Sequence, residues 1–204
     1  DLLATAVGTM PRGQPDSPNH KSRVAWYRNP GEPATGKWVR HVIEDRLPAA
    51  IHGQPVDLDV DGDLDVVMAH GMRIESDPTI SRHQVVWYEN TTKGKGIPRW
   101  TRHQVGRLPF AFEAVAGDID GDGDIDIAAT AWSKGDRVVW FENGGHNKWT
   151  QHVVRTDFRA ANQVILVDLD GDQRLDIVAG ADDGSRRVKG ALELRWWRND
   201  GRRK

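Results

Sequence analysis

The chain of 204 residues has 38% hydrophobic content and a formal net charge of −2, which suits one domain with an apolar core. It contains nine tryptophans and no cysteine, so disulfides and thiolate chemistry are excluded. No apolar stretch reaches the length of a membrane span, and the first residues lack the basic start and apolar centre of a signal peptide.

Taken in chain order, the sequence predicts one β-strand after another. The first is the apolar run that follows Asp1. A strand of the form apolar-Trp-aromatic-x-Asn comes next at 26–29, and then a Trp-x-x-His segment at 38–41. A further apolar run leads into an acidic loop at 57–65, and a β-rich run follows that loop.

The same succession recurs along the chain. The Trp-aromatic-x-Asn segment returns at 87–90, 140–143 and 196–199, the Trp-x-x-His segment at 100–103 and 149–152, and the acidic loop at 118–126 and 168–176. Each unit thus has an inner apolar strand, the loop, a second strand, a Trp-aromatic-x-Asn strand and a Trp-x-x-His strand. A four-stranded unit that returns after about 50–60 residues is typical of a β-propeller blade.

Both ends of the chain fall inside a unit. Asp1 occupies the place of the last aspartate of an acidic loop, and the last unit stops after Asn199. The sequence therefore predicts units of three, four, four and three strands, at about 1–46, 47–107, 108–156 and 157–204. Because exposed sheet edges favour pairing, we expect the remaining blades of a longer chain, or self-association, to complete the ring.

The acidic loops have an aspartate at nearly every second position, and such dense negative charge needs a cation. Positions 1, 3, 5 and 9 supply carboxylates and position 7 a backbone carbonyl, an all-oxygen shell that suits Ca²⁺ better than the strictly octahedral Mg²⁺. We expect three calcium sites. Their residues are Asp57, Asp59, Asp61, Asp63 and Asp65; Asp118, Asp120, Asp122, Asp124 and Asp126; and Asp168, Asp170, Asp172, Arg174 (through its carbonyl) and Asp176.

An EF-hand loop begins in the same way but continues differently. Its twelfth position is a bidentate glutamate on an exiting helix, whereas position 12 here is Met68, Ala129 or Ala179. The residues after position 9 are short β-rich runs. These loops are therefore predicted to connect two strands.

With these motifs the chain resembles, over essentially its whole length, the FG-GAP or VCBS repeat β-propellers, which share the Asp-x-Asp-x-Asp-Gly-x-x-Asp loop with integrin α-subunits and a fungal propeller lectin. The Trp-containing segments are most similar to a secreted bacterial and fungal branch that accompanies carbohydrate-binding or carbohydrate-active proteins. The resemblance implies an all-β fold of calcium-stapled blades, usually seven, of which this chain would form a segment. Gln173 stands where the other loops have Gly62 and Gly123, so if this position needs a positive φ the third site should be the weakest.

A residue that recurs at the same position of successive units is expected to have a structural role rather than a catalytic or ligand-binding one. His41, His103 and His152 recur at one position of successive units, so they lie too far apart to share an ion and are expected to be structural. The repeated tryptophans are expected to pack between blades for the same reason. Residues that differ between units are better candidates for a ligand site.

Two sets of such residues are predicted to meet at one rim of the central channel. His52, Glu113 and Gln163 stand five residues before the loops, and His70, Trp132 and Asp182 stand five or six residues after them. Their expected neighbours are Arg73, Phe110, Phe112, Lys134, Arg159 and Asn162. This rim offers the aromatic faces and directed polar groups that sugar binding requires. The predicted ligand-binding residues are His52, His70, Glu113, Trp132, Arg159 and Gln163.

Three functions remain open. We expect a calcium-stabilised module that is secreted or lies at the periplasmic or cell surface, because weak calcium sites fill only where the ion is plentiful, and that binds carbohydrate or another extracellular ligand. Alternatively, the chain is a carbohydrate-active lyase or dehydratase in which His52, His70 and Glu113 transfer protons. A third hypothesis is an integrin-like adhesion module that contacts protein through its second-to-third-strand loops, such as 10–21. No nucleic-acid partner is expected.

Overall fold

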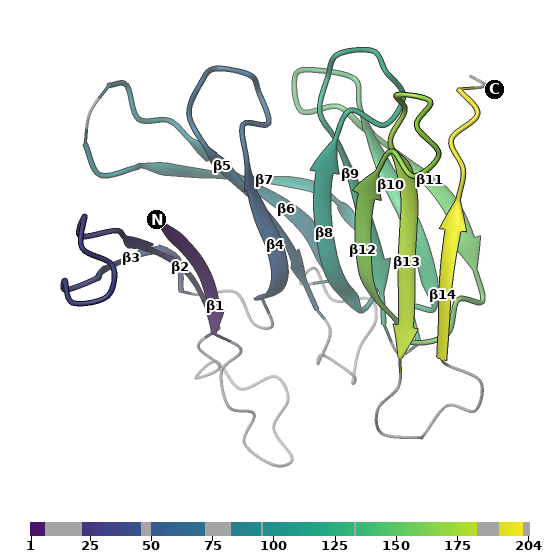
Figure 1. The fold of residues 1–204 in the computed structure, drawn as a ribbon, viewed down its shortest axis with the longest axis horizontal. Coiled ribbons are helices and arrows are strands. Elements are labelled where there is room, and N and C mark those ends of the chain that lie inside the picture. Colours follow the sequence, from purple (N-terminus) through teal and green to yellow (C-terminus); the bar gives the residue numbers. More distant parts are fainter. Residues whose placement is uncertain are drawn as a thin grey trace.

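The computed structural model describes residues 1–6, 22–45, 50–71, 83–94, 96–132, 134–182 and 192–201. These residues form fourteen β-strands in four antiparallel sheets, and no helix occurs among them (Figure 1). The all-β prediction is confirmed, as is the distribution of three, four, four and three strands. With no helix in the described ranges, none that could span a membrane is found there.

Each sheet is built from strands that are consecutive in the chain. The first sheet contains β1 (Leu2–Ala6), β2 (Arg23–Arg28) and β3 (Val39–Glu44). The second contains β4 (Ala50–Val56), β5 (Asp65–His70), β6 (Gln84–Asn90) and β7 (Trp100–Arg107). The third contains β8 (Ala111–Gly117), β9 (Asp126–Ala131), β10 (Arg137–Asn143) and β11 (Trp149–Thr156). The fourth contains β12 (Ala161–Val167), β13 (Asp176–Asp182) and β14 (Leu192–Trp197).

The acidic loops join the first two strands of the second, third and fourth sheets. They connect β4 to β5, β8 to β9 and β12 to β13, and all three lie in the upper part of Figure 1. A strand begins at the ninth position of each loop, so the prediction of strand-to-strand loops is confirmed. Every residue of β5 and β9 is buried, because these strands are covered on both faces.

Successive sheets pack face to face, with a cluster of buried apolar side chains between each pair. On β9, Ile127 and Ala129 belong to the cluster shared with the second sheet, whereas Ala128 belongs to the cluster shared with the fourth. This alternation follows from the pleat of the strand, which points neighbouring side chains to opposite faces. Trp87 of β6 is 7% exposed and lies in the first of these clusters, in agreement with packing between sheets.

The innermost strands of the sheets lie beside one another. Strand β4 contacts β8, and β8 contacts β12. Strand β1, which is equivalent to β5 and is the innermost strand present in the first sheet, contacts β4, so the sheets follow in chain order from purple to yellow (Figure 1). The four sheets remain separate, and within the described ranges they form no closed ring. The common edge that they share is where the inner-strand side chains of different units can meet.

One face of the last sheet is apolar and exposed. Leu192, Leu194 and Trp196 alternate along β14 and are 84%, 80% and 43% exposed. On β10, the equivalent residues Val138 and Trp140 pack against the fourth sheet. The same face of the repeat is therefore covered in the third sheet and open in the fourth.

Candidate functional site

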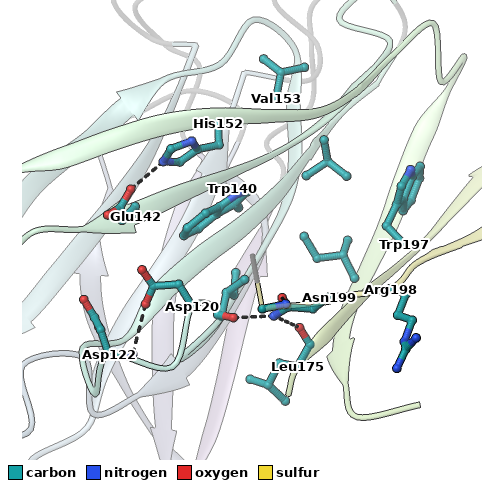
Figure 2. Close-up of a pocket in the computed structure, with 14 residues that line it drawn as sticks. Asp120, Asp122, Trp140, Glu142, His152, Val153, Leu175, Trp197, Arg198 and Asn199 are labelled. Carbon is teal, nitrogen blue, oxygen red and sulfur yellow. Dashed lines mark hydrogen bonds and ion pairs between the residues drawn. The ribbon is translucent and has the colours of Figure 1, made fainter. Parts of the chain in front are cut away.

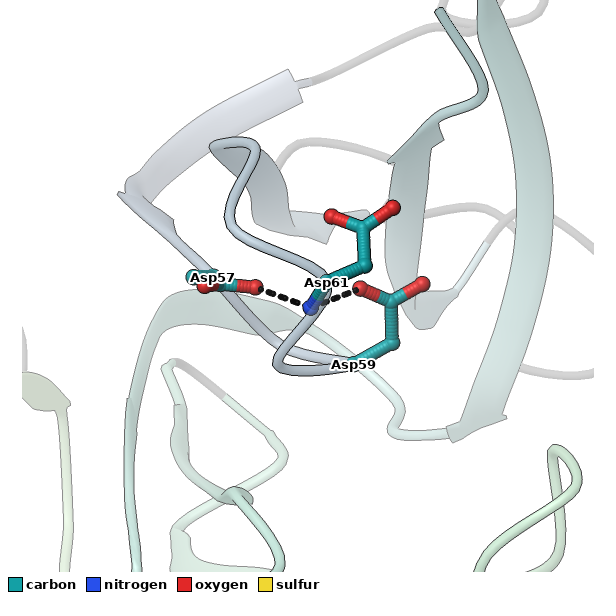
Figure 3. A group of neighbouring side chains, drawn as sticks. All are labelled: Asp57, Asp59 and Asp61. Atoms are coloured by element: carbon teal, nitrogen blue, oxygen red, sulfur yellow. Dashed lines mark hydrogen bonds between the residues drawn. The ribbon is translucent and has the colours of Figure 1, made fainter. Parts of the chain in front are cut away.

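Three aspartate triads form the candidate metal centres. Each consists of positions 1, 3 and 5 of an acidic loop: Asp57, Asp59 and Asp61; Asp118, Asp120 and Asp122; and Asp168, Asp170 and Asp172. One carboxylate oxygen from each member lies within 4.8 Å of those of the other two. Figure 3 shows the first triad gathered around the turn of its loop. At this spacing, one cation could contact all three carboxylates of a loop.

Hydrogen bonds from the loop's own amides hold each triad in place. In the first loop, Asp57 accepts from the amides of Asp61 and Gly62, both at 3.1 Å, and Asp59 accepts from Asp61 at 3.3 Å (Figure 3). The second and third loops repeat this arrangement with small variations. The carboxylates are therefore positioned by the backbone.

Positions 4 and 6 of the loops adopt left-handed backbone conformations. At position 6, φ is 95° for Gly62, 98° for Gly123 and 69° for Gln173, so the predicted need for a positive φ is confirmed. Position 4 of the first loop is Val60, with φ of 58°, a conformation that β-branched residues rarely adopt. Both Val60 and Gln173 therefore strain their loops. That the third site binds its ion most weakly stays a prediction.

The ninth aspartate of each loop lies outside the triads and ties the loop to another strand. Asp65 is 1% exposed; its Oδ2 accepts a hydrogen bond from the amide of Leu58 at 3.1 Å, and its Oδ1 accepts one from the amide of Asn90 at 2.7 Å. Asp126 and Asp176 make the same two bonds in their own sheets. A direct contribution of these carboxylates to an ion stays a prediction.

We call the ninth aspartate with its two amide hydrogen bonds the clip of the loop. The asparagine that ends each Trp-aromatic-x-Asn segment adds a further hydrogen bond to this clip. The side-chain amide of Asn143 donates to the carbonyl of Ile125 at 3.1 Å, and that of Asn199 donates to the carbonyl of Leu175 at the same distance. Sequence reasoning identified the segment but assigned no role to its asparagine. The sequence signal that could have revealed this role is that each acidic loop is followed by one such asparagine in the same unit.

The pKa values of the buried ninth aspartates are shifted from their ordinary value. Burial raises the pKa of both Asp65 and Asp126 to about 6 in the metal-free chain, although amide hydrogen bonds oppose the rise. Burial also acts on Asp176, but hydrogen bonds from the amides of Asn199 and Leu169 outweigh it, so the pKa of Asp176 is lowered. Asp176 has no exposed surface but belongs to a sheet that is covered on one face only.

The first two loops fit a calcium ion. Each contains five carboxylates and no cationic side chain, and Ca²⁺ takes six to eight oxygen ligands in flexible geometry. Burial raises the pKa of Asp59, and the charges of Asp61 and Glu89 raise it further, which is the field that a divalent cation would relieve. In the third loop, Arg198 contacts two of the three triad carboxylates.

A cavity of about 560 Å³ runs along the innermost strands. His52 of β4, Glu113 of β8 and Gln163 of β12 line it together with residues of β1. These are the three residues that stand five positions before the acidic loops, and the fold brings them together. The cavity thus contains one imidazole, one carboxyl group and one carboxamide from three successive sheets.

A β-bulge at the start of each inner strand sets the direction of these side chains. The pairing register shifts at 50–53, 111–113 and 161–163. Bulges of this kind bend a strand and re-aim its side chains. Gly53 allows the closest approach, because a Cβ atom there would lie 2.0 Å from the carbonyl oxygen of Val67.

One polar group of the cavity, His52, lies against an aromatic ring. Nδ1 of His52 is 4.0 Å from Oε1 of Glu113, whose Oε2 accepts a 2.8 Å hydrogen bond from the amide of Val164. Burial raises the pKa of Glu113, while the Val164 bond and His52 oppose the rise. The ring of Phe112 lies edge-on to His52 at 5.0 Å and tilted against Trp132 at 6.4 Å. Acid, base and aromatic surface therefore adjoin one another.

The other predicted rim residues do not line this cavity. His70 is fully buried, and its Nε2 lies 3.2 Å from the hydroxyl of Tyr88, so it is enclosed within its own sheet. Arg159 is exposed on the connection between β11 and β12, and Asp182 is exposed at the end of β13. Arg73 lies outside the described residues.

A second cavity, of about 570 Å³, opens between the third and fourth sheets (Figure 2). On one side, His152 stacks on Trp140 with ring centroids 4.5 Å apart, and its Nε2 lies 2.6 Å from Oε2 of Glu142. On the other side lie Trp197 and Arg198 (Figure 2). Sequence reasoning missed this cavity because its lining belongs to repeated segments, whose repetition indicates architecture.

The stacked pair itself recurs in the other sheets. His41 stacks on Trp26 at 4.3 Å, and His103 stacks on Trp87 at 4.6 Å. His103 also lies 2.6 Å from a carboxylate oxygen of Glu89, as His152 does from Glu142. Each histidine thus joins two strands of its own sheet.

Comparison with known families agrees with this repeated architecture. The model of the FG-GAP-like repeat matches the chain twice, at residues 57–129 and 118–179. Together the matches cover more than half of the chain and include all three acidic loops. A search of curated proteins finds no match. The chain therefore belongs to the family of FG-GAP-like repeat proteins.

Proposed function

We propose that the chain is a calcium-stabilised part of an extracellular β-propeller that binds a carbohydrate, or another extracellular ligand, in the cavity lined by His52, Glu113 and Gln163. The observation that carries this proposal is the convergence of these three residues. They occupy equivalent positions in successive units and differ in every one. Positions that are equal in each unit serve the fold, whereas positions that differ and meet in a cavity are suited to recognition.

Two features support the propeller and its completion by further sheets. The four sheets pack face to face in chain order with their innermost strands adjacent, as blades do. The open face of β14 is apolar where the equivalent face of β10 is covered. Further blades of a longer chain, or a second copy, would cover it. Family membership and the acidic loops support a secreted or cell-surface location, where calcium is abundant.

The chemistry of the cavity favours a sugar ligand. Sugars are bound by aromatic rings against their apolar faces and by directed hydrogen bonds to their hydroxyls. Glu113 and Gln163 supply hydrogen-bonding groups in the lining, while the ring of Phe112 packs against His52, and Trp132 packs against Phe112, next to the cavity.

Glycan-array binding tests this proposal. The chain should bind a defined set of glycans, and Glu113→Gln and His52→Ala should each weaken that binding by at least about tenfold, which corresponds to the loss of one directed contact. His146→Ala, in the exposed turn between β10 and β11, is the matched control and should bind normally. Unchanged glycan binding in both cavity variants would exclude this cavity as the ligand site.

A second candidate function is proton transfer on a sugar substrate. It is favoured by the raised pKa of Glu113, caused by burial, and by the 4.0 Å separation between Glu113 and His52. His70 does not join this pair, because it is enclosed elsewhere. Turnover of uronate polysaccharides or keto-sugars that disappears in Glu113→Gln would establish the lyase or dehydratase hypothesis. Binding without turnover would favour recognition.

The third hypothesis, adhesion of the integrin type, depends on the loops between the second and third strands. Residues 10–21 and most of the equivalent loops lie outside the described residues, whereas 134–136 of the short loop between β9 and β10 are described. Deleting residues 12–18 tests this hypothesis, since an adhesion module should then lose its protein partner.

A further inference from the structure

One position of the Trp-aromatic-x-Asn segment changes its charge between sheets. The residue before the asparagine is Glu89 in the second sheet and Glu142 in the third, but Arg198 in the fourth. Each glutamate binds a histidine of its own sheet at 2.6 Å. In the fourth sheet the corresponding side chain turns to the acidic loop instead.

Arg198 lies directly against the third triad. Its Nε is 2.5 Å from Oδ2 of Asp170, and its Nη2 is 3.3 Å from Oδ2 of Asp172. The charge of Asp170 and its hydrogen bond, together with that to Asp172, raise the pKa of the Arg198 guanidinium, which like any arginine is charged at neutral pH. One guanidinium therefore spans two of the three carboxylates that an ion would bridge.

A second arginine contacts the same triad from within the loop. Arg174 occupies position 7, where the other loops have Asp63 and Asp124. Its Nη2 pairs with Asp172, and its Nε donates to the carbonyl of Asn199 at 2.8 Å, which holds the guanidinium over the loop. The carboxylate that the first two loops have at this position is thus replaced by a positive charge.

The charge balance of the three loops differs accordingly. The first two loops each contain five carboxylates without a cationic side chain, and a glutamate stands at the position of Arg198. The third loop contains four carboxylates, and two arginines pair with its triad. Since the charge of the ligand set tunes calcium affinity, the three loops should not bind the ion equally. The strained Gln173 acts in the same direction.

We propose that Arg198 and Arg174 neutralise the third loop in place of calcium, so that the described part of the chain holds two tightly bound calcium ions rather than three. This inference rests on the proposed calcium binding by the first two loops. The fourth sheet would then keep its loop closed at calcium concentrations that empty the other two.

Calcium stoichiometry tests the inference directly. Isothermal titration and equilibrium dialysis of the full chain with CaCl₂ should give two tight sites, with any third site at least about tenfold weaker. The double variant Arg174→Gln, Arg198→Gln should add a third site, and Arg198→Gln alone should strengthen that site in part. Arg195→Gln is the matched control: it removes the same charge from β14, which ends one residue before Arg198, but Arg195 pairs with Glu193 instead of the loop. A reciprocal variant, Glu142→Arg, should weaken the second site by at least about tenfold.

The outcomes separate the two proposals. Three sites of similar affinity in the unaltered chain, or two sites that persist when both arginines are replaced, would overturn the neutralisation by arginine and leave calcium binding intact. Absence of calcium binding at the first two loops would overturn the proposed calcium-stabilised module and this inference with it. Circular dichroism of each variant confirms that its sheets are formed.

Discussion

The backbone amide of Asn90 donates a 2.7 Å hydrogen bond to Oδ1 of Asp65 across 25 residues of the chain. Through it, the last residue of an acidic loop is fastened to the third strand of its sheet. The same bond is present in all four sheets, between Asn29 and Asp1 (2.7 Å), Asn143 and Asp126 (2.9 Å), and Asn199 and Asp176 (2.7 Å). The ninth aspartate therefore holds the repeat together whether or not it also contacts an ion.

Removing one clip should destabilise the chain strongly. In Asp126→Ala, the buried amides of Ile119 and Asn143 lose a charged acceptor, and each such loss costs about 1–3 kcal/mol. We expect the free energy of unfolding to fall by at least about 2 kcal/mol in thermal or urea unfolding. Asp124→Ala, at an exposed position of the same loop, is the control and should change stability by less than about 0.5 kcal/mol without calcium.

Calcium should raise the melting temperature. An ion that binds only the folded chain adds about 2.7 kcal/mol at one hundred times its Kd, which amounts to at least about 5 °C for a chain of this size. Calorimetry of the metal-depleted chain with added CaCl₂ measures the shift, and MgCl₂ at the same concentration should give a smaller one because Mg²⁺ dehydrates reluctantly. Identical melting curves with and without calcium would rule out a stabilising role.

Replacing the two strained loop residues by glycine should stabilise the chain. Val60→Gly and Gln173→Gly each remove a left-handed side chain, at φ of 58° and 69°, whose cost is about 1 kcal/mol or more. Urea unfolding should show a net gain for each variant that is smaller than this, because glycine also adds freedom to the unfolded chain. Leu64→Gly, at an exposed loop position without positive φ, provides the control and should lower stability, since glycine only adds freedom to the unfolded chain there. Equal effects in all three variants would argue against backbone strain.

The open face of β14 should make the isolated chain associate. Leu192, Leu194 and Trp196 expose a continuous apolar stripe along an edge strand. Sedimentation velocity should therefore reveal concentration-dependent association, which Leu194→Lys should reduce. Ile97→Lys replaces a single exposed apolar residue in the turn between β6 and β7 and should leave association unchanged. A chain that stays monomeric at all concentrations would show that the apolar face of β14 does not drive association.

Much of the architecture was predictable because the repeat displays each element several times. The strand order and the place of the loops follow from alternating aspartates next to β-branched runs, and the structure agrees. The meeting of His52, Glu113 and Gln163 also follows from equal spacing to the loops. The spacing of these residues within each unit can be read from a single sequence, because the unit occurs several times along it.

The contacts that depend on three-dimensional detail could not be predicted in this way. His70 stands five residues after its loop whereas Trp132 stands six after its own, so His70 is equivalent to the buried Ala131 and is itself buried, against Tyr88. The turn of Arg198 to Asp170 depends on a side-chain rotamer that no spacing encodes. The role of Asn90 was hidden because an asparagine after a strand is also typical of an ordinary turn.

The metal-free chain should lose stability as the pH rises from about 4 to about 7. Burial raises the pKa of Asp65 and Asp126 to about 6 in the folded state, from 3.8 as the reference value for the unfolded chain. Between these values the folded state binds more protons than the unfolded state, so the free energy of unfolding falls as these carboxyls ionise. Since one unit of pKa corresponds to about 1.4 kcal/mol, the total fall should be at least about 1 kcal/mol, or about 2–4 °C. Circular dichroism melts in metal-depleted buffers measure it, and saturating calcium should reverse the slope because the ion favours the charged carboxylates. The double variant Asp65→Asn, Asp126→Asn should flatten the profile, and a metal-free chain that gained stability over this range would show that these carboxylates ionise without cost.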